Sequence, residues 1–289
     1  MISKRNDRIG KTILLTGASS YVGARMYLDL KDKYRTIGTY FHHPLSKRFV
    51  QLNLTSKEAV QRIFHELTPA VVIHVANYPS GKNAINNEED FIALNGKSTK
   101  YVVESANEIG AKVIFISSQA ANNPNDLYGK LKVTSEDQVK SVHAGYLILR
   151  PSLIVGLSPN TINDRPFNRI LRCLEDRVKI AEFDTSWKLQ PTYLGHLSQI
   201  IDRVILGNEW NKIVPVFIKE IVTQYQIAHD ILSRFRVNVN PIDLHLRIPL
   251  SKDDVTNFEA LDLSPHSYHE MIETIIGEIK NRKMFSFSE

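Results

Sequence analysis

The chain has 289 residues, which is enough for one large α/β domain with a substantial core. Its 36 Lys and Arg against 31 Asp and Glu give a formal charge of +5, spread along the chain; this favours an anionic small molecule over nucleic acid as partner. The single Cys173 excludes an internal disulfide, and the sequence shows no secretory signal, so we expect a soluble, cytoplasmic protein. No apolar run reaches the roughly 18 residues of a membrane span.

Short β-branched runs alternate with longer amphipathic stretches in the first half of the chain. We predict strands at 12–16, 36–41, 71–76, 112–117 and 145–151, and helices at 21–33, 56–67, 88–109 and 127–142. This alternation is typical of right-handed βαβ crossovers, so we predict a Rossmann-type, doubly wound parallel sheet. We assign residues 1–156 to an NADP-binding domain, and residues 157–289 to a segment that completes the sheet and forms a small C-terminal subdomain on the substrate side.

A glycine-containing turn follows the first predicted strand in TILLTGASSYVG. Gly17 and Gly23 occupy the first and last glycine positions of a dinucleotide-binding fingerprint, and Ser20 replaces the middle glycine. Such a turn lets the backbone approach a pyrophosphate at a helix N-terminus. We predict that Gly17, Ser20, Tyr21, Val22 and Gly23 contact the cofactor; the alternative is a tight turn that binds nothing.

The loop after the second predicted strand bears on the choice of cofactor. An NAD site usually carries an acid there for the ribose 2′-hydroxyl, whereas TIGTYFHHPLSKRF has Tyr40, His42, His43, Lys47 and Arg48. These cationic or titratable side chains suit a 2′-phosphate, so we predict NADP(H) over NAD(H), with His42 as a contact. The alternative is a solvated loop.

Tyrosine followed four residues later by lysine occurs three times, and position separates the three pairs. Tyr27/Lys31 lies in the first predicted helix, a turn beyond the glycine turn, where an amphipathic tyrosine and a solvated lysine are ordinary. Tyr78/Lys82 spans YPSGK, whose Pro and Gly argue against a helix. Tyr128/Lys132 starts the helix after the fourth predicted strand, where the i,i+4 spacing places both side chains on one face.

Two serines, Ser117 and Ser118, end that strand at its ligand-facing end. Adjacent strand residues point to opposite faces, so we expect only one hydroxyl to reach a site. A serine with Tyr128 and Lys132 suits proton transfer to an oxygen while a hydride moves to carbon. A free phenol has a pKa near 10, so work near neutral pH requires about 4 kcal/mol of preferential phenolate stabilisation.

The motifs TGASSYVG, PAVVIHVAN, ALNGKS, VIFISSQ, LYGKLKVTSE, LILRPSLIVG and PTYLGHLSQII occur in this order between about residues 12 and 201. In this order the chain resembles the extended short-chain dehydrogenase/reductase family, and within it the dTDP-4-dehydrorhamnose reductases most closely. The resemblance implies an oxidoreductase in which Tyr128 donates a proton to a carbonyl, Lys132 lowers the pKa of Tyr128 and holds the nicotinamide ribose, and Ser118 orients the carbonyl.

The same resemblance implies further cofactor contacts at Asn53, Leu54, Ala76 and Asn77, and a proton path supported by Asn95. Asn53 and Asn95 are also explained by turns or caps, in which Asn is common. This chain departs from the family in two places. Only QAANNPNDL separates the serine from the tyrosine, where the family usually has a longer segment, and DTSWKLQ lacks the Asp-Gln pair of the rhamnose-forming enzymes. The physiological substrate therefore stays open.

We expect a keto group on a nucleotide sugar as substrate, with Arg165, Arg169 and Lys188 as candidate diphosphate contacts; each is otherwise a solvated charge. A homodimer is possible, and we assign no metal site. Two alternatives remain open. One is an NAD-dependent sugar epimerase or dehydratase; the other is a non-catalytic NADP-binding subunit similar to the regulatory β-subunit of methionine adenosyltransferase.

Overall fold

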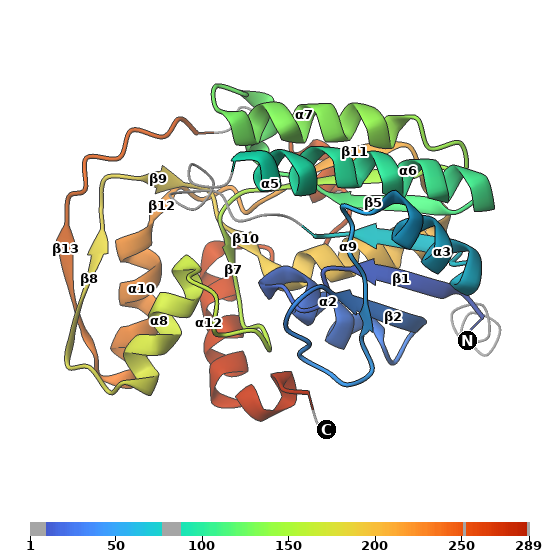
Figure 1. The fold of residues 1–289 in the computed structure, drawn as a ribbon. Helices are drawn as coiled ribbons and strands as arrows, with labels where there is room; N and C mark the ends of the chain where they lie inside the picture. Colours follow the sequence, from blue (N-terminus) through green and yellow to red (C-terminus); the bar gives the residue numbers. More distant parts are fainter. Residues whose placement is uncertain (1–9, 77–87, 251–252, 288–289) are drawn as a thin grey trace.

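The computed structural model describes residues 10–76, 88–250 and 253–287. Its centre is a seven-stranded sheet in the order β11-β6-β5-β4-β1-β2-β3, and every neighbouring pair is parallel (Figure 1). The strands are β1 Thr12–Thr16, β2 Arg35–Tyr40, β3 Val50–Gln51, β4 Val71–His74, β5 Lys112–Ile116, β6 Tyr146–Pro151 and β11 Lys212–Val216. The predicted Rossmann-type sheet is confirmed.

Helices cover both faces of the sheet. α3 (Lys57–Leu67), α6 (Ser98–Ile109) and α7 (Leu127–Lys140) pack on one face around a core that includes Phe64 and Phe115. α2 (Tyr21–Leu30) and α9 (Leu194–Gly207) pack on the other face. The buried strands are rich in Val, Ile and Leu because helices cover them on both sides.

The predicted helix at 88–109 is interrupted. It consists of α5 (Glu88–Ile92), a π-helical turn η1 (Ala93–Lys97) and α6. A π-turn disturbs the regular i→i−4 hydrogen bonding, and here the carbonyl of Asn95 accepts a hydrogen bond from the hydroxyl of Ser135 on α7, at 2.8 Å. The helix pattern alone gave no sign of this bulge, since it depends on packing against α7.

The strand order reverses at β1, whose neighbours are β2 and β4. In sheets of this type ligands bind beyond the carboxyl ends of the strands near this reversal. Gly17 and Ser117 directly follow β1 and β5. The topology therefore brings the glycine turn and the serines to the same edge of the sheet.

The chain after residue 157 returns one strand, β11, to the main sheet and builds a smaller unit beside it (Figure 1). The small unit contains two-stranded sheets formed by β8 with β13 and by β9 with β12. A third two-stranded sheet pairs β7 with β10. From β7 onward, the elements other than α9 and β11 are β7 Ile154–Val155, α8 Pro166–Glu175, β8 Ile180–Asp184, β9 Lys188–Leu189, β10 Thr192–Tyr193, β12 Val222–Thr223, α10 Gln224–Leu232, η3 Ser233–Phe235, β13 Asn238–Ile242, α11 Thr256–Glu259, α12 Tyr268–Lys280 and η4 Arg282–Phe285. The boundary at residue 156 stays a prediction.

The C-terminal helix α12 is joined to α2 by a buried ion pair between Arg25 and Glu278, with Nη2 and Oε1 2.8 Å apart. The hydroxyl of Tyr193 donates to the same carboxylate oxygen at 2.6 Å. Both charged side chains are only 7% exposed, so these contacts, rather than solvent, stabilise the two charges. Among the described residues, no helix has the length and apolar character needed to cross a membrane.

Candidate active site

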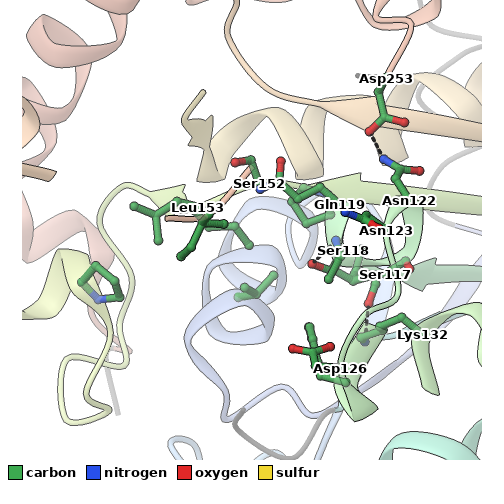
Figure 2. A pocket seen from close by; sticks show the side chains of 18 of the residues that line it. Ser117, Ser118, Gln119, Asn122, Asn123, Asp126, Lys132, Ser152, Leu153 and Asp253 are labelled. Carbon is green, nitrogen blue, oxygen red and sulfur yellow. Dashed lines mark hydrogen bonds between the residues drawn. The ribbon is translucent and has the colours of Figure 1, made fainter. Parts of the chain in front are cut away.

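A cavity of about 980 Å³ lies at the carboxyl ends of the strands, between the sheet and the smaller unit (Figure 2). Its walls come from the first turn of α2, the loop after β5, the start of α7, the segment after β6, and the irregular chain before α11. The residues that line it include Ser20, Tyr21, Val22, Ser117, Ser118, Asn122, Asp126, Tyr128, Lys132, Arg165, Ile248, Pro249, Leu250 and Asp253.

The predicted trio of Ser118, Tyr128 and Lys132 lies on this one cavity. α7 begins directly before the tyrosine because Asp126 caps it, accepting a hydrogen bond from the backbone N–H of Gly129 at 2.7 Å. The i,i+4 spacing then brings Nζ of Lys132 to 5.6 Å from the centre of the Tyr128 ring. The competing Tyr27 is a core residue whose ring packs edge-on against another aromatic ring, while Tyr78/Lys82 lies outside the described residues.

Lys132 is buried at the back of the cavity. Its ammonium donates to the carbonyl oxygen of Ile116 at 3.1 Å and lies 4.7 Å from the centre of the Phe115 ring. Burial lowers the pKa of Lys132 to about 7, and the nearby carboxylate of Glu136 opposes that shift. An amine of this kind changes its charge near neutral pH.

The two serines point to different partners. The hydroxyl of Ser117 donates to Oε1 of the buried Glu136 at 2.5 Å. The hydroxyl oxygen of Ser118 accepts from the N–H of Ala120 at 3.2 Å and caps the short 3₁₀ turn η2 (Gln119–Asn122). Ser118 is the less buried of the two, and its hydroxyl donates to no acceptor within the part of the chain that the structure describes, so the proton is available to a ligand.

The glycine turn has the shape that its sequence predicts. Gly17 has φ +70°, and a Cβ there would lie 2.8 Å from the Cα of Ala76; a Cβ on Gly23 would lie 2.2 Å from the carbonyl oxygen of Gly17. Ser20 caps α2 by accepting from the N–H of Gly23 at 3.0 Å. The serine in the middle position thus serves the helix start.

The donor set at this turn fits a dinucleotide phosphate. The backbone N–H groups of Tyr21 and Val22 lie in the first turn of α2 beside the cavity and have no acceptor among the described residues. The side chain of Tyr21 is buried, and its hydroxyl donates to the carbonyl of Gly156 at 2.5 Å, so burial raises its pKa. Tyr21 therefore offers its backbone rather than its phenol.

Among the described residues, the others predicted to contact the cofactor, and Asn95 with its predicted proton path, lie outside the walls of this cavity. His42 is exposed beside Phe41, and Asn53 accepts two hydrogen bonds from Thr55 in a local turn. Leu54 belongs to the core, Ala76 packs against Gly17, and Asn95 is buried. Asn77 lies outside the described residues.

The three candidate diphosphate contacts separate clearly. Arg165 lines the cavity at the N-terminus of α8, and no ion pair or side-chain hydrogen bond joins it to another described residue. Arg169 forms a two-point ion pair with Asp164, Nε–Oδ1 2.9 Å and Nη2–Oδ2 2.7 Å, on the exposed surface. Lys188 is also exposed and is not a wall residue. Of these three side chains, Arg165 is the one that lines the cavity.

The structure also brings in residues to which the sequence reasoning gave no role. Arg150, which is half-buried, forms an ion pair with the buried Glu136 beside Ser117, and Asn122 and Asp253 extend it across the cavity wall. Glu136 and Arg150 occur in two of the quoted motifs, which was the available signal. Asp253 had no signal, because it reaches the site only through the path of the C-terminal chain.

A family model described as the RmlD substrate binding domain matches residues 11–251. The chain belongs to this family. The resemblance inferred from the ordered motifs is thereby confirmed.

Among curated relatives, methionine adenosyltransferase 2 subunit beta from Mus musculus is 28% identical over 161 residues, which is 50% of this chain and 48% of that protein. The chain thus matches about half the length of that relative. A dTDP-4-dehydrorhamnose reductase from Aggregatibacter actinomycetemcomitans is 24% identical over 213 residues, 68% of this chain and 69% of that protein.

Solved structures share the fold over nearly the whole chain. A dTDP-4-dehydrorhamnose reductase from Bacillus anthracis in complex with NADP gives a TM-score of 0.77 at 20% identity, covering 93% of this chain and 99% of that one. An epimerase from Methanothermobacter thermautotrophicus gives a TM-score of 0.77 at 17% identity, covering 98% and 96%. At these identities the likeness establishes the fold.

Proposed function

We propose that this protein is an NADPH-dependent reductase of a keto group on a nucleotide sugar. The observation that carries the proposal is the joint presence of Ser118, Tyr128 and Lys132 on one cavity with the first turn of α2. Membership of the RmlD family and the relatives named as dTDP-4-dehydrorhamnose reductases support it.

Each part of the cavity has a task in this reaction. The N–H groups at the start of α2 bind the cofactor pyrophosphate, and Arg165 binds the substrate diphosphate. Bound NADPH supplies the hydride. Ser118 holds the substrate carbonyl by a hydrogen bond, and the Tyr128 hydroxyl gives its proton to the carbonyl oxygen as that oxygen gains negative charge. The ammonium of Lys132 stabilises the phenolate that remains.

NADPH is proposed over NADH because no carboxylate stands at the end of β2. His42, Lys47 and Arg48 form an exposed, basic loop there, which suits a 2′-phosphate. Their positions outside the main cavity are compatible with an adenosine end that lies along the outer sheet edge.

A steady-state assay of NADPH oxidation tests the proposal, with dTDP-4-dehydrorhamnose and a panel of other keto-sugar nucleotides. We expect turnover with at least one of them, and a fall in cofactor fluorescence on binding. An oxidised cofactor that stays bound through purification, with sugar epimerisation and no net oxidation, would instead favour an epimerase.

A second candidate is a regulatory, cofactor-binding subunit, which the matches to methionine adenosyltransferase 2 subunit beta favour. The short link between Ser118 and Tyr128 also leaves less chain for substrate contacts than the reductases have. Cofactor binding without turnover on the whole panel would support this candidate and reject the reductase.

A further inference from the structure

Four hydrogen-bonded polar side chains connect α7 to the part of the cavity wall formed by Ile248–Leu250 and Asp253, which we call the substrate-side wall. The carboxylate of Glu136, which is 1% exposed, accepts from Arg150 at two points, Nε–Oε1 2.9 Å and Nη2–Oε2 2.5 Å. Nη1 of Arg150 donates to Oδ1 of Asn122. In turn, Nδ2 of Asn122 donates to Oδ2 of Asp253 (Figure 2). The second oxygen of Asp253 lies 4.0 Å from the guanidinium.

These four side chains join three walls of the cavity. Glu136 lies one helical turn after Lys132 on α7, and Asn122 ends the turn η2 that follows Ser118. Asp253 follows the wall residues Ile248–Leu250. Arg150, near the end of β6, therefore connects α7 to η2 and, through Asn122, to Asp253.

The wall that Asp253 anchors has no regular secondary structure between residues 243 and 250. On its near side it is held to the small unit, since the N–H of Leu244 donates to Asp184 at 3.0 Å and that of Leu246 donates to Ser186 at 2.9 Å. Neither of these two hydrogen bonds connects the wall to α7. The hydrogen bond that Asn122 donates to Asp253 connects the wall to η2 and, through Arg150 and Glu136, to α7, and it joins chain segments more than a hundred residues apart.

We propose that Arg150 is a positioning residue that, through Asn122 and Asp253, fixes the substrate-side wall at a set distance from Tyr128. The proposal rests on the reductase function, and it adds that this link determines how a substrate fits between the wall and Tyr128. A guanidinium serves this purpose because its planar fork binds Glu136 at two points and leaves another N–H for Asn122. The side chains of Arg150 and Asp253 are 18% and 11% exposed, so solvent screens their interaction only in part.

The test acts at Asp253, because removing Arg150 would leave Glu136 buried without its cation and would threaten the fold. Asp253→Ala is compared with Asp254→Ala, a matched control one residue further on. Asp254 is exposed and accepts from the N–H of Thr256 at 2.9 Å, which is a local turn contact. Asn122→Ala and the double variant Asn122→Ala/Asp253→Ala complete a double-mutant cycle.

In the steady-state assay we expect Asp253→Ala to raise KM for the keto-sugar nucleotide about tenfold, with kcat within about twofold and NADPH affinity unchanged. Asn122→Ala should have a similar effect, and the double variant no more than either single change, because both cut the same connection. Asp254→Ala should match the wild type. A fall in kcat without a change in KM, or additive effects of the two changes, would overturn the proposal.

Hydrogen exchange gives a readout that does not depend on turnover. We expect amides in residues 243–250 and 119–125 to exchange severalfold faster in Asp253→Ala and Asn122→Ala than in Asp254→Ala. Equal exchange in the Asp253→Ala and Asp254→Ala proteins would overturn the positioning role. If the wild type turned over no substrate but exchange still responded as expected, the reductase proposal would fail while the mechanical link stood.

Discussion

Lys132 and Glu136 lie one turn apart on the buried face of α7, yet the structure shows no ion pair between them. Glu136 accepts hydrogen bonds from Arg150 and Ser117, whereas the ammonium of Lys132 donates to the carbonyl of Ile116. The glutamate therefore only moderates the effect of burial, and the pKa of Lys132 stays near 7. An amine beside Tyr128 is thus kept close to its titration point.

Lys132→Met should stabilise the fold while removing activity. The ordinary pKa of this amine is 10.5, and the folded value is about 7, so between these pH values the unfolded chain binds more protons. The free energy of unfolding of the wild type therefore rises with pH over this window, by up to about 5 kcal/mol. At pH 7 the variant should be more stable by about 2 to 4 kcal/mol, and its advantage should shrink toward pH 10.5.

Urea unfolding at pH 7, 8, 9 and 10 measures this difference. Lys130→Met is the control, because Lys130 is exposed on the same helix and should show no such trend. A constant difference between Lys132→Met and the wild type over this range would contradict the titration.

Tyr128→Phe should abolish turnover, with kcat reduced at least about 100-fold. NADPH should still bind, as measured by the change in cofactor fluorescence. The change removes one hydroxyl and keeps the ring against its neighbours. Tyr27→Phe is the control, since Tyr27 is a core residue with the same spacing to a lysine. Unchanged turnover in Tyr128→Phe would reject the assignment of the proton donor.

Arg165→Ala should weaken binding of the nucleotide diphosphate, with Kd for dTDP raised about tenfold, because a charge-assisted hydrogen bond is lost in the cavity. Arg169→Ala, four residues along, should change Kd less than about twofold, since that guanidinium is paired with Asp164 outside the cavity. Calorimetric titration of both variants with dTDP measures the two Kd values. Equal effects would show that Arg165 does not contact the ligand.

His42→Glu should raise KM for NADPH about tenfold and leave KM for NADH unchanged, because a carboxylate would repel the 2′-phosphate. Comparison of the two cofactors at low and high salt checks the prediction, since screening should reduce the effect. His143→Glu, at an exposed site after α7, is the control. Equal changes with both cofactors would reject a role for this loop in 2′-phosphate recognition.

His74 should make the protein sensitive to acid. Its two ring nitrogens hydrogen-bond to Thr16 and Thr99, at 2.8 and 3.2 Å, and burial, with a smaller effect from the charge of Lys132, lowers its pKa to about 3. The neutral form contributes stability above pH 6.5, and this contribution is lost as pH falls toward 3, by about 1.4 kcal/mol per pH unit. His74→Gln should flatten the stability curve between pH 6.5 and 4.5.

Denaturant titrations of the wild type and His74→Gln at pH 4.5, 5.5 and 6.5 measure the two slopes. His143→Gln, an exposed histidine, should follow the wild type. Parallel curves for all three proteins would contradict the assignment to His74.

Several features followed from the sequence because they depend on local periodicity and local backbone needs. The parallel sheet followed from the alternation of β-branched and amphipathic runs, and the turn at Gly17 from the need for a positive φ beside a strand. The choice of Tyr128/Lys132 over Tyr27/Lys31 followed from position in that order, and the structure adds that Tyr27 lies in the core.

Other features depended on contacts between distant parts of the chain, which periodicity does not encode. The π-turn at Ala93–Lys97 reflects packing against α7, and the separation of Arg165 from Arg169 reflects which side of α8 meets the cavity. The link from Glu136 through Arg150 and Asn122 to Asp253 joins α7, β6, η2 and the irregular segment before α11. Only the folded path of the chain brings these side chains within hydrogen-bonding distance, so only the tertiary structure decided them.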